Sequence, residues 1–155
     1  MSERISSSDN QYVIFKLDNE SYGIDILQVE TIEKVMDITR VPHSPLYVEG
    51  VINLRGEVVP VINLRKRFKL IDMNNNDDNN RIIIVTLEDM IVGLLVDSSS
   101  EVIHLNGEEI EETPKLSNHI DIDYINLIGK KDNRIIMLLD LKKVLGVSIS
   151  EMTEH

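Results

Sequence analysis

The sequence contains no cysteine, no tryptophan and no alanine among its 155 residues. Without cysteine, the chain can form no disulfide, no thiolate zinc site and no cysteine-ligated iron–sulfur cluster, and it has no thiol nucleophile. Alanine is the best helix former, whereas isoleucine and valine, which are abundant here, favour strands. The composition therefore predicts a mainly β protein with few and short helices.

Positive charge and aromatic rings are also scarce. Lysine and arginine together number 16 against 27 acidic residues, which gives a formal net charge of -11, and aromatic residues make up 4% of the chain. Such a surface repels nucleic-acid phosphates and anionic membranes, and it offers few rings for stacking on bases. We therefore expect no nucleic-acid partner.

Long apolar runs are absent as well. No window approaches the roughly 18 apolar residues that a membrane helix needs. Residues 1–10 lack the apolar segment of a secretory signal. We therefore expect a cytoplasmic protein that does not insert into a membrane.

The sequence has no motif of a catalytic or phosphate-binding site. It contains no GxGxxG, no GxxxxGK followed by Ser or Thr, and no GxSxG segment. The four histidines show neither HExxH nor HxH spacing. Carboxylates gather in one short stretch, where a solvated acidic loop is a commoner structure than an acid–base pair: Glu108, Glu109, Glu111 and Glu112. We expect no enzymatic activity, no metal and no cofactor.

Polar segments divide the chain into two parts of similar size. Residues 1–10 are expected to form a flexible tail, 73–80 (MNNNDDNN) an Asn/Asp-rich linker and 148–155 a second tail. The linker lacks the glycine and the terminal glutamate of a calcium-binding loop. We expect residues 11–72 and 81–147 to form one β-barrel unit each, and we leave open whether strands are exchanged between the units.

The second part of the chain repeats the first. YVIFKLDNESYGI (12–24) aligns without a gap with IIIVTLEDMIVGL (82–94), and VINLRG (51–56) matches YINLIG (124–129). Several such matches in the same order indicate a duplicated unit of about five short strands. A unit of this size can close into a barrel, but it buries a marginal core alone. We therefore expect two barrels that pack against each other and leave a groove between them.

The ends of the two parts also match. VVPVINLRKRF (58–68) corresponds to IIMLLDLKKVL (135–145), and in each a cap residue, Asn63 or Asp140, precedes a short helix. Pro60 lies inside the first of these runs. Because proline cannot donate a ladder hydrogen bond, we expect its strand to be an edge or to carry a bulge.

Arg55 is the one basic residue whose position suggests a binding role. It lies beside a turn glycine in NLRG (53–56), between two apolar strands. A plain surface arginine is the commoner interpretation, and the alternative is a side chain that reaches across the groove. Val29 and Ile32 also allow two interpretations: they pack in the core, or they line the wall of a partner-binding groove.

These motifs resemble the CheW-type chemotaxis coupling proteins. The resemblance rests on YGIDIL (22–27), GVINLRG (50–56) and VPVINLR (59–65) in this order, and it extends over most of the chain, from about Gln11 to Gly146. It implies two five-stranded barrels of the Src-homology type, stacked around a third hydrophobic core. It also implies a non-catalytic adaptor that joins the regulatory domain of the histidine kinase CheA to the cytoplasmic tips of chemoreceptors.

The resemblance carries over receptor-binding positions. Val29 and Ile32 would line the groove that receives the helical receptor tip, Gly50 would allow close approach, and Arg55 matches the family's NLRG arginine.

Kinase-binding positions follow from the same resemblance. Val41 and Val48 would lie near the strand ends that contact CheA. Two alternatives remain open: a detached regulatory domain of a CheA-type kinase, which shares the fold, and a double barrel that binds a small ligand in its groove.

Overall fold

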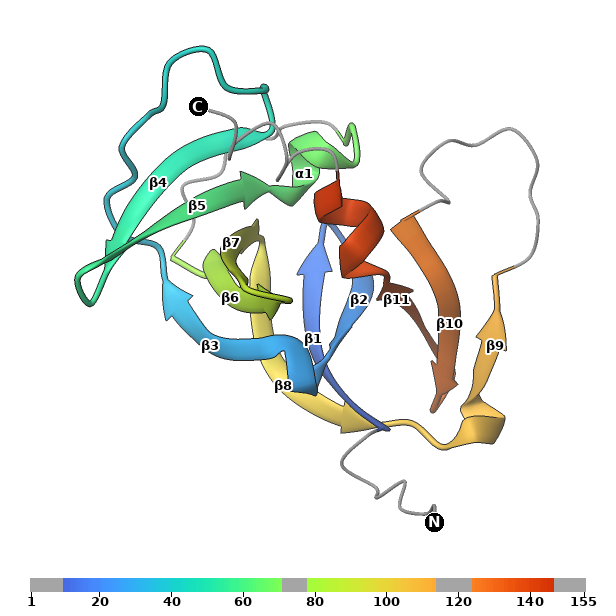
Figure 1. The fold of residues 1–155 in the computed structure, drawn as a ribbon. Coiled ribbons are helices and arrows are strands. Elements are labelled where there is room, and N and C mark those ends of the chain that lie inside the picture. Colours follow the sequence, from blue (N-terminus) through green and yellow to red (C-terminus); the bar gives the residue numbers. More distant parts are fainter. Residues whose placement is uncertain (1–9, 71–77, 114–123, 147–155) are drawn as a thin grey trace.

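The computed structural model describes residues 10–70, 78–113 and 124–146. The first part of the chain contributes β1 (Gln11–Leu17), β2 (Glu20–Asp25), η2 (Ile26–Gln28), β3 (Val29–Lys34), β4 (Val48–Leu54), β5 (Glu57–Asn63) and α1 (Leu64–Arg67). The second part contributes β6 (Arg81–Leu87), β7 (Met90–Val96), β8 (Ser98–His104), η3 (Gly107–Glu109), β9 (Ile110–Glu112), β10 (Ile125–Lys131) and β11 (Arg134–Leu139), followed by a helix over 141–146. The predicted mainly β class with short helices is confirmed (Figure 1).

The strands form two sheets, and each sheet mixes strands of both halves. The six-stranded sheet has the order β8-β1-β2-β11-β10-β9, and the five-stranded sheet has the order β3-β6-β7-β5-β4. Among the described residues, the end strands of neither sheet pair with each other. The two sheets are therefore open, whereas we expected closed five-stranded barrels. The exchange of strands that the sequence left open occurs, and the division of the chain at residues 73–80 stays a prediction.

The strand registers confirm the internal repeat. Ile32 of β3 lies opposite Ile83 of β6, and Val102 of β8 lies opposite Val13 of β1. These two pairs are related by the shift of 70 residues that aligns the two halves. Each half therefore lends its third strand to the first strand of the other half.

The predicted cap residues are confirmed at both helices. Asn63 Oδ1 accepts a hydrogen bond from the backbone N–H of Lys66 at 3.2 Å. Asp140 Oδ1 accepts one from the N–H of Lys143 at 3.4 Å. A carboxylate or amide oxygen at this position satisfies an N–H that has no partner inside the helix.

Three apolar cores hold the two sheets. The largest lies between them, because alternate residues of one strand face opposite sides of a sheet: Ile83 and Val85 of β6 face this core, whereas Ile82 and Ile84 face the second core. The second core contains the buried residues Ile52, Val59, Val61, Ile82 and Ile84, and the third contains Ile14, Leu105, Ile136 and Leu138. A core between two β units is the arrangement that the resemblance implied.

Pro60 lies in β5, which is an interior strand and not an edge strand. Its pairing with β7 begins only at Val61, so at Pro60 the strand pairs with β4 alone, opposite Val51. The missing N–H of proline therefore costs no ladder hydrogen bond to β7.

A single bridge brings the segment after β3 onto the outer edge of β4. The backbone groups of Thr39 and Val51 exchange two hydrogen bonds of 2.8 Å. Gly50 makes this approach possible, since its φ is +147° and a Cβ added there would lie 2.1 Å from the Thr39 carbonyl oxygen. β3 is the strand at the other end of the same sheet, so this bridge almost completes a barrel.

Replacement of Gly50 by alanine is expected to lower the free energy of unfolding by about 1–3 kcal/mol, because the added Cβ collides with Thr39 and the backbone conformation disfavours a side chain. Gly107→Ala is the matched control, since a Cβ there meets no atom within 4 Å. Chemical denaturation of both variants measures the difference. Equal losses in the two variants would contradict the role of Gly50.

Candidate functional site

The edge strand β3 presents apolar side chains at the rim of the core between the sheets. The register shifts between Val29 and Thr31, so that Val29 lies opposite Val85 and Ile32 opposite Ile83. Both partners belong to the core between the sheets, and residues directly opposite each other share a face. Val29 is half-buried against that core, whereas Ile32 is 39% exposed. The structure thus brings these two predicted residues onto one face.

Three further exposed apolar residues lie on or near the strands that flank this core. Leu27 lies in η2, the short helix that directly precedes β3, and Val35 directly follows β3; both side chains are exposed. Val102 of β8 is the repeat equivalent of Ile32 and is also exposed. The sequence analysis missed Val102, although the 70-residue shift that aligns the two halves places it on Ile32.

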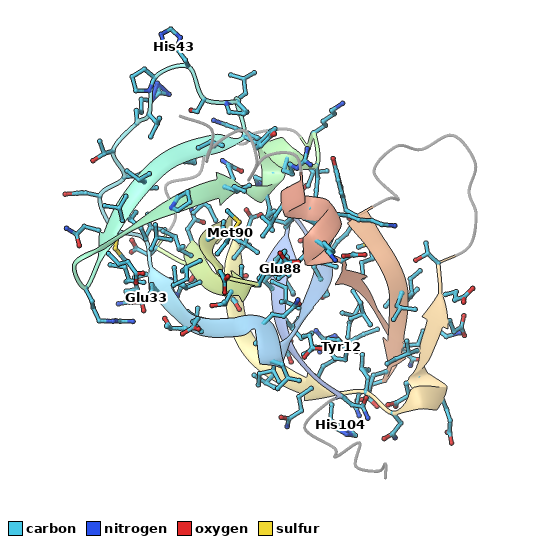
Figure 2. All side chains as sticks on the ribbon, viewed as in Figure 1. Tyr12, Glu33, His43, Glu88, Met90 and His104 are labelled. Atoms are coloured by element: carbon cyan, nitrogen blue, oxygen red, sulfur yellow. The ribbon has the colours of Figure 1, made fainter. Side chains whose placement is uncertain are left out.

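Gly50 and Arg55 have different surroundings. Gly50 is buried, and the close approach that it permits is to Thr39 of its own chain. Arg55 lies in the turn between β4 and β5, with its side chain 67% exposed and its Nη2 3.6 Å from a carboxylate oxygen of Glu33. Glu33, which Figure 2 shows beside that hairpin, belongs to β3. Arg55 therefore connects the hairpin to the strand that carries Ile32.

The loop between β3 and β4 carries an exposed apolar surface. Val41 is exposed, Leu46 is 89% exposed, and the Ser44 hydroxyl donates to the Val41 carbonyl at 2.8 Å. Figure 2 shows that the loop, marked by His43, projects from the five-stranded sheet. Val48 is only 7% exposed, so its burial argues against the direct kinase contact that we predicted for it. Val41 remains available at the surface, and Leu46 was missed.

Three charged residues form a group that we name the Arg65 clamp: Arg65, Asp18 and Asp97. Arg65 Nε and Nη2 donate to the two carboxylate oxygens of Asp97, each at 2.8 Å, and Nη2 also donates to Asp18. The N–H of Asp18 donates to Asp97 at 2.7 Å. The hydrogen bonds that Arg65 donates to Asp97 and, to a smaller extent, to Asp18 outweigh the opposing effect of burial and raise the pKa of Arg65 above its usual range.

A second arginine of α1 ties the two halves together. The Arg67 guanidinium lies between the rings of Tyr47 and Tyr124, 4.7 and 4.8 Å from their centroids. Its Nε donates to the Val144 carbonyl at 2.9 Å. Cation–π stacking of this kind is strongest when the cation is withdrawn from water. Tyr47 directly follows Leu46, so this contact fixes one end of the exposed loop.

Two carboxylates of the acidic cluster form ion pairs with lysines of β10. Lys130 lies 2.6 Å from Glu111, and Lys131 lies 3.8 Å from Glu109. Within the described ranges, no group of three or more His, Cys, Asp or Glu residues could hold a metal ion. No helix in the same part of the chain is long and apolar enough to cross a membrane.

Arg65 and Arg55, which both have acidic partners, should differ in their effect on stability. Arg65→Ala is expected to lower the free energy of unfolding by about 3 kcal/mol, because it leaves two carboxylates beside each other without their cation. Arg55→Ala should change it by less than about 0.5 kcal/mol, because exposed ion pairs contribute little. Urea denaturation tests both, and a large loss in Arg55→Ala would show that Arg55 is structural.

Comparison with known proteins gives one consistent result. A family model described as the CheW-like domain matches residues 11–148. The chain is 39% identical over 140 residues to the chemotaxis protein CheW of Bacillus subtilis (strain 168), across 90% of this chain and 88% of that protein. It is 34% identical over 145 residues to the chemotaxis protein CheW of Treponema pallidum (strain Nichols), across 92% and 85%.

A solved structure agrees with these relatives. The crystal structure of the scaffolding protein TtCheW from Thermoanaerobacter tengcongensis matches with a TM-score of 0.81 and 37% sequence identity, over 90% of this chain and 94% of that chain. The family model, the relatives and the fold cover the same two sheets, and the chain belongs to the CheW-like domain family.

Proposed function

We propose that this protein is a non-catalytic adaptor that couples chemoreceptors to the histidine kinase CheA in the cytoplasm, at receptor arrays. The observation that supports it most is the exposed apolar rim on β3, in a chain of the CheW-like domain family. An adaptor needs two separate surfaces and no reactive group. The β3 rim and the loop between β3 and β4 are two such surfaces on one rigid scaffold.

The receptor would bind at the rim of the core between the sheets. Val29 and Ile32 share a face of β3, and Val102 occupies the equivalent position on β8. A helical receptor tip with apolar residues at helical spacing fits a surface of this kind, since burial of apolar area supplies the affinity.

Arg55 would act at the edge of the receptor surface. Its guanidinium is exposed and only loosely held by Glu33, so it can exchange that partner for an acidic or amide group of the receptor. A charge at the rim of an interface contributes mainly to association rate and specificity. Gly50 would contribute indirectly, because it fixes the Thr39 bridge that lies beyond β3.

The kinase would bind at the loop between β3 and β4. Val41 and Leu46 are exposed there and follow Thr39 along the chain, whereas the β3 rim precedes it. Val48 supports the loop from the core and would not touch the kinase. The Arg67 stack on Tyr47 limits the freedom of the loop, which lowers the entropic cost of binding.

A mixing experiment on a sizing column tests the adaptor role. The components are this protein, the CheA regulatory domain and a receptor cytoplasmic fragment from the same organism. We expect co-elution with each component singly and with both together, because the two surfaces are separate. Binding to neither component by the folded protein would refute the proposal and would direct the search to small ligands.

Two substitutions should separate the surfaces, and each serves as the control for the other. Ile32→Asp should weaken receptor binding by at least about tenfold, the cost of burying a carboxylate in an apolar contact, and leave kinase binding unchanged. Leu46→Asp should show the reverse pattern. Calorimetry with each partner measures both affinities. Loss of both affinities in either variant, without unfolding, would contradict the assignment of separate surfaces.

A further inference from the structure

The Arg65 clamp lies where the chain passes from one sheet to the other. Asp97 stands between β7 of the five-stranded sheet and β8 of the six-stranded sheet. Arg65 comes from α1, which follows β5 of the five-stranded sheet, and Asp18 comes from the turn between β1 and β2 of the six-stranded sheet. The Arg65 side chain is 9% exposed. The Arg65 clamp therefore links the β7–β8 crossover both to α1, which follows the five-stranded sheet, and to a turn of the six-stranded sheet.

The internal repeat supplies a comparison within the same molecule. At the other crossover, from β2 to β3, the positions equivalent to the clamp hold Glu88, Lys142 and Leu27. Lys142 Nζ is 3.9 Å from Glu88, and the two side chains are 75% and 72% exposed. Leu27, which stands where the clamp has an aspartate, is exposed. The fold forms this crossover once with the Arg65 clamp and once without it, so the crossover itself does not require the clamp.

The clamp has a direct consequence for β8. This strand begins at Ser98, immediately after Asp97, and it is an edge strand that pairs with β1 alone. Its attachment to the five-stranded sheet is made through Asp97 and Arg65. The paired, bidentate hydrogen bonds of an arginine with a carboxylate fix direction as well as distance. The clamp thus sets the position of β8, and of Val102 on it, relative to the sheet that contains β3.

We propose that Arg65 and Asp97 are positioning residues for receptor binding, which hold the edge strand β8 at a fixed place relative to β3. The inference rests on the proposed receptor contact at Ile32 and Val102. The clamp itself need not touch the receptor. Its contribution is to hold the two apolar edges in the relative position that one helical tip can contact together.

Asp97→Asn is the main test, because it keeps the shape of the side chain and removes the charge. We expect the affinity for a receptor cytoplasmic fragment to fall at least about fivefold, the lower end of typical couplings between separate sites. The affinity for the CheA regulatory domain should not change. Glu88→Gln, at the repeat equivalent of Asp18, is the matched control and should leave both affinities unchanged. Asp18→Asn, a milder change at a half-exposed residue, serves if Asp97→Asn does not fold.

The position of β8 can be measured without any binding partner. The chain has no cysteine, so cysteines introduced at the exposed residues Lys34 of β3 and Val102 of β8 carry spin labels at defined sites. The distance distribution between the labels should broaden in Asp97→Asn and remain narrow in Glu88→Gln.

The outcomes distinguish this inference from the proposed function. Unchanged receptor affinity with unchanged label distances in the folded Asp97→Asn variant would overturn the positioning role. A parallel fall of receptor affinity, kinase affinity and unfolding midpoint would overturn it too, since the clamp would then serve stability alone. A wild-type protein that binds no receptor fragment refutes the proposed function, and the label distances then still decide whether the clamp holds β8.

Discussion

The apolar core between the two sheets is the contact on which the rest of the molecule depends, because neither half of the chain completes a sheet alone. β1 and β2 join strands of the second half, and β6 and β7 join strands of the first. The core between the sheets combines Phe15 and Ile24 of one sheet with Ile83 and Leu94 of the other. Burial of this shared surface drives both halves to fold together. The surfaces at its rim are therefore placed by the whole chain and not by one half.

Apolar packing alone does not fix the orientation of the packed elements, and two arginines of α1, Arg65 and Arg67, supply directional contacts. Arg65 bonds to Asp18 in a turn of the six-stranded sheet and to Asp97 in the crossover between the sheets, and Arg67 stacks between tyrosines from both halves. Apolar burial has no preferred orientation, whereas a planar guanidinium accepts partners only in fixed directions. The two residues lie close in sequence, yet one acts near the start of β8 and the other at the end of the loop that carries Leu46. They connect the core to the two proposed binding surfaces.

The sequence predicted the class of the fold, the repeat and the caps, because these depend on local composition and spacing. Asn63 and Asp140 cap their helices as the pattern indicated. The prediction that each unit closes into a barrel was wrong, because the order of strands in a sheet depends on long-range pairing, which a local pattern does not contain. Val48 shows the same limit for the site: it is the first residue of β4 and is buried, whereas Leu46, two residues earlier in the loop, is exposed. The burial of each side chain depends on the tertiary packing of strand and loop, which the local sequence does not contain.

The duplicated unit explains how one scaffold can present unlike surfaces. The repeat gives each crossover and each edge strand two copies, and substitution at matched positions then makes them different. Where one copy has Asp97, held by Arg65, the other has exposed Leu27 beside β3. Where one edge strand has Ile32, the other has Val102, and both remain exposed. Both edge strands keep an exposed apolar residue at the matched position, whereas the two crossovers differ. This pattern is expected if both edges contact the one helical tip that we propose, while only one crossover has to be fixed.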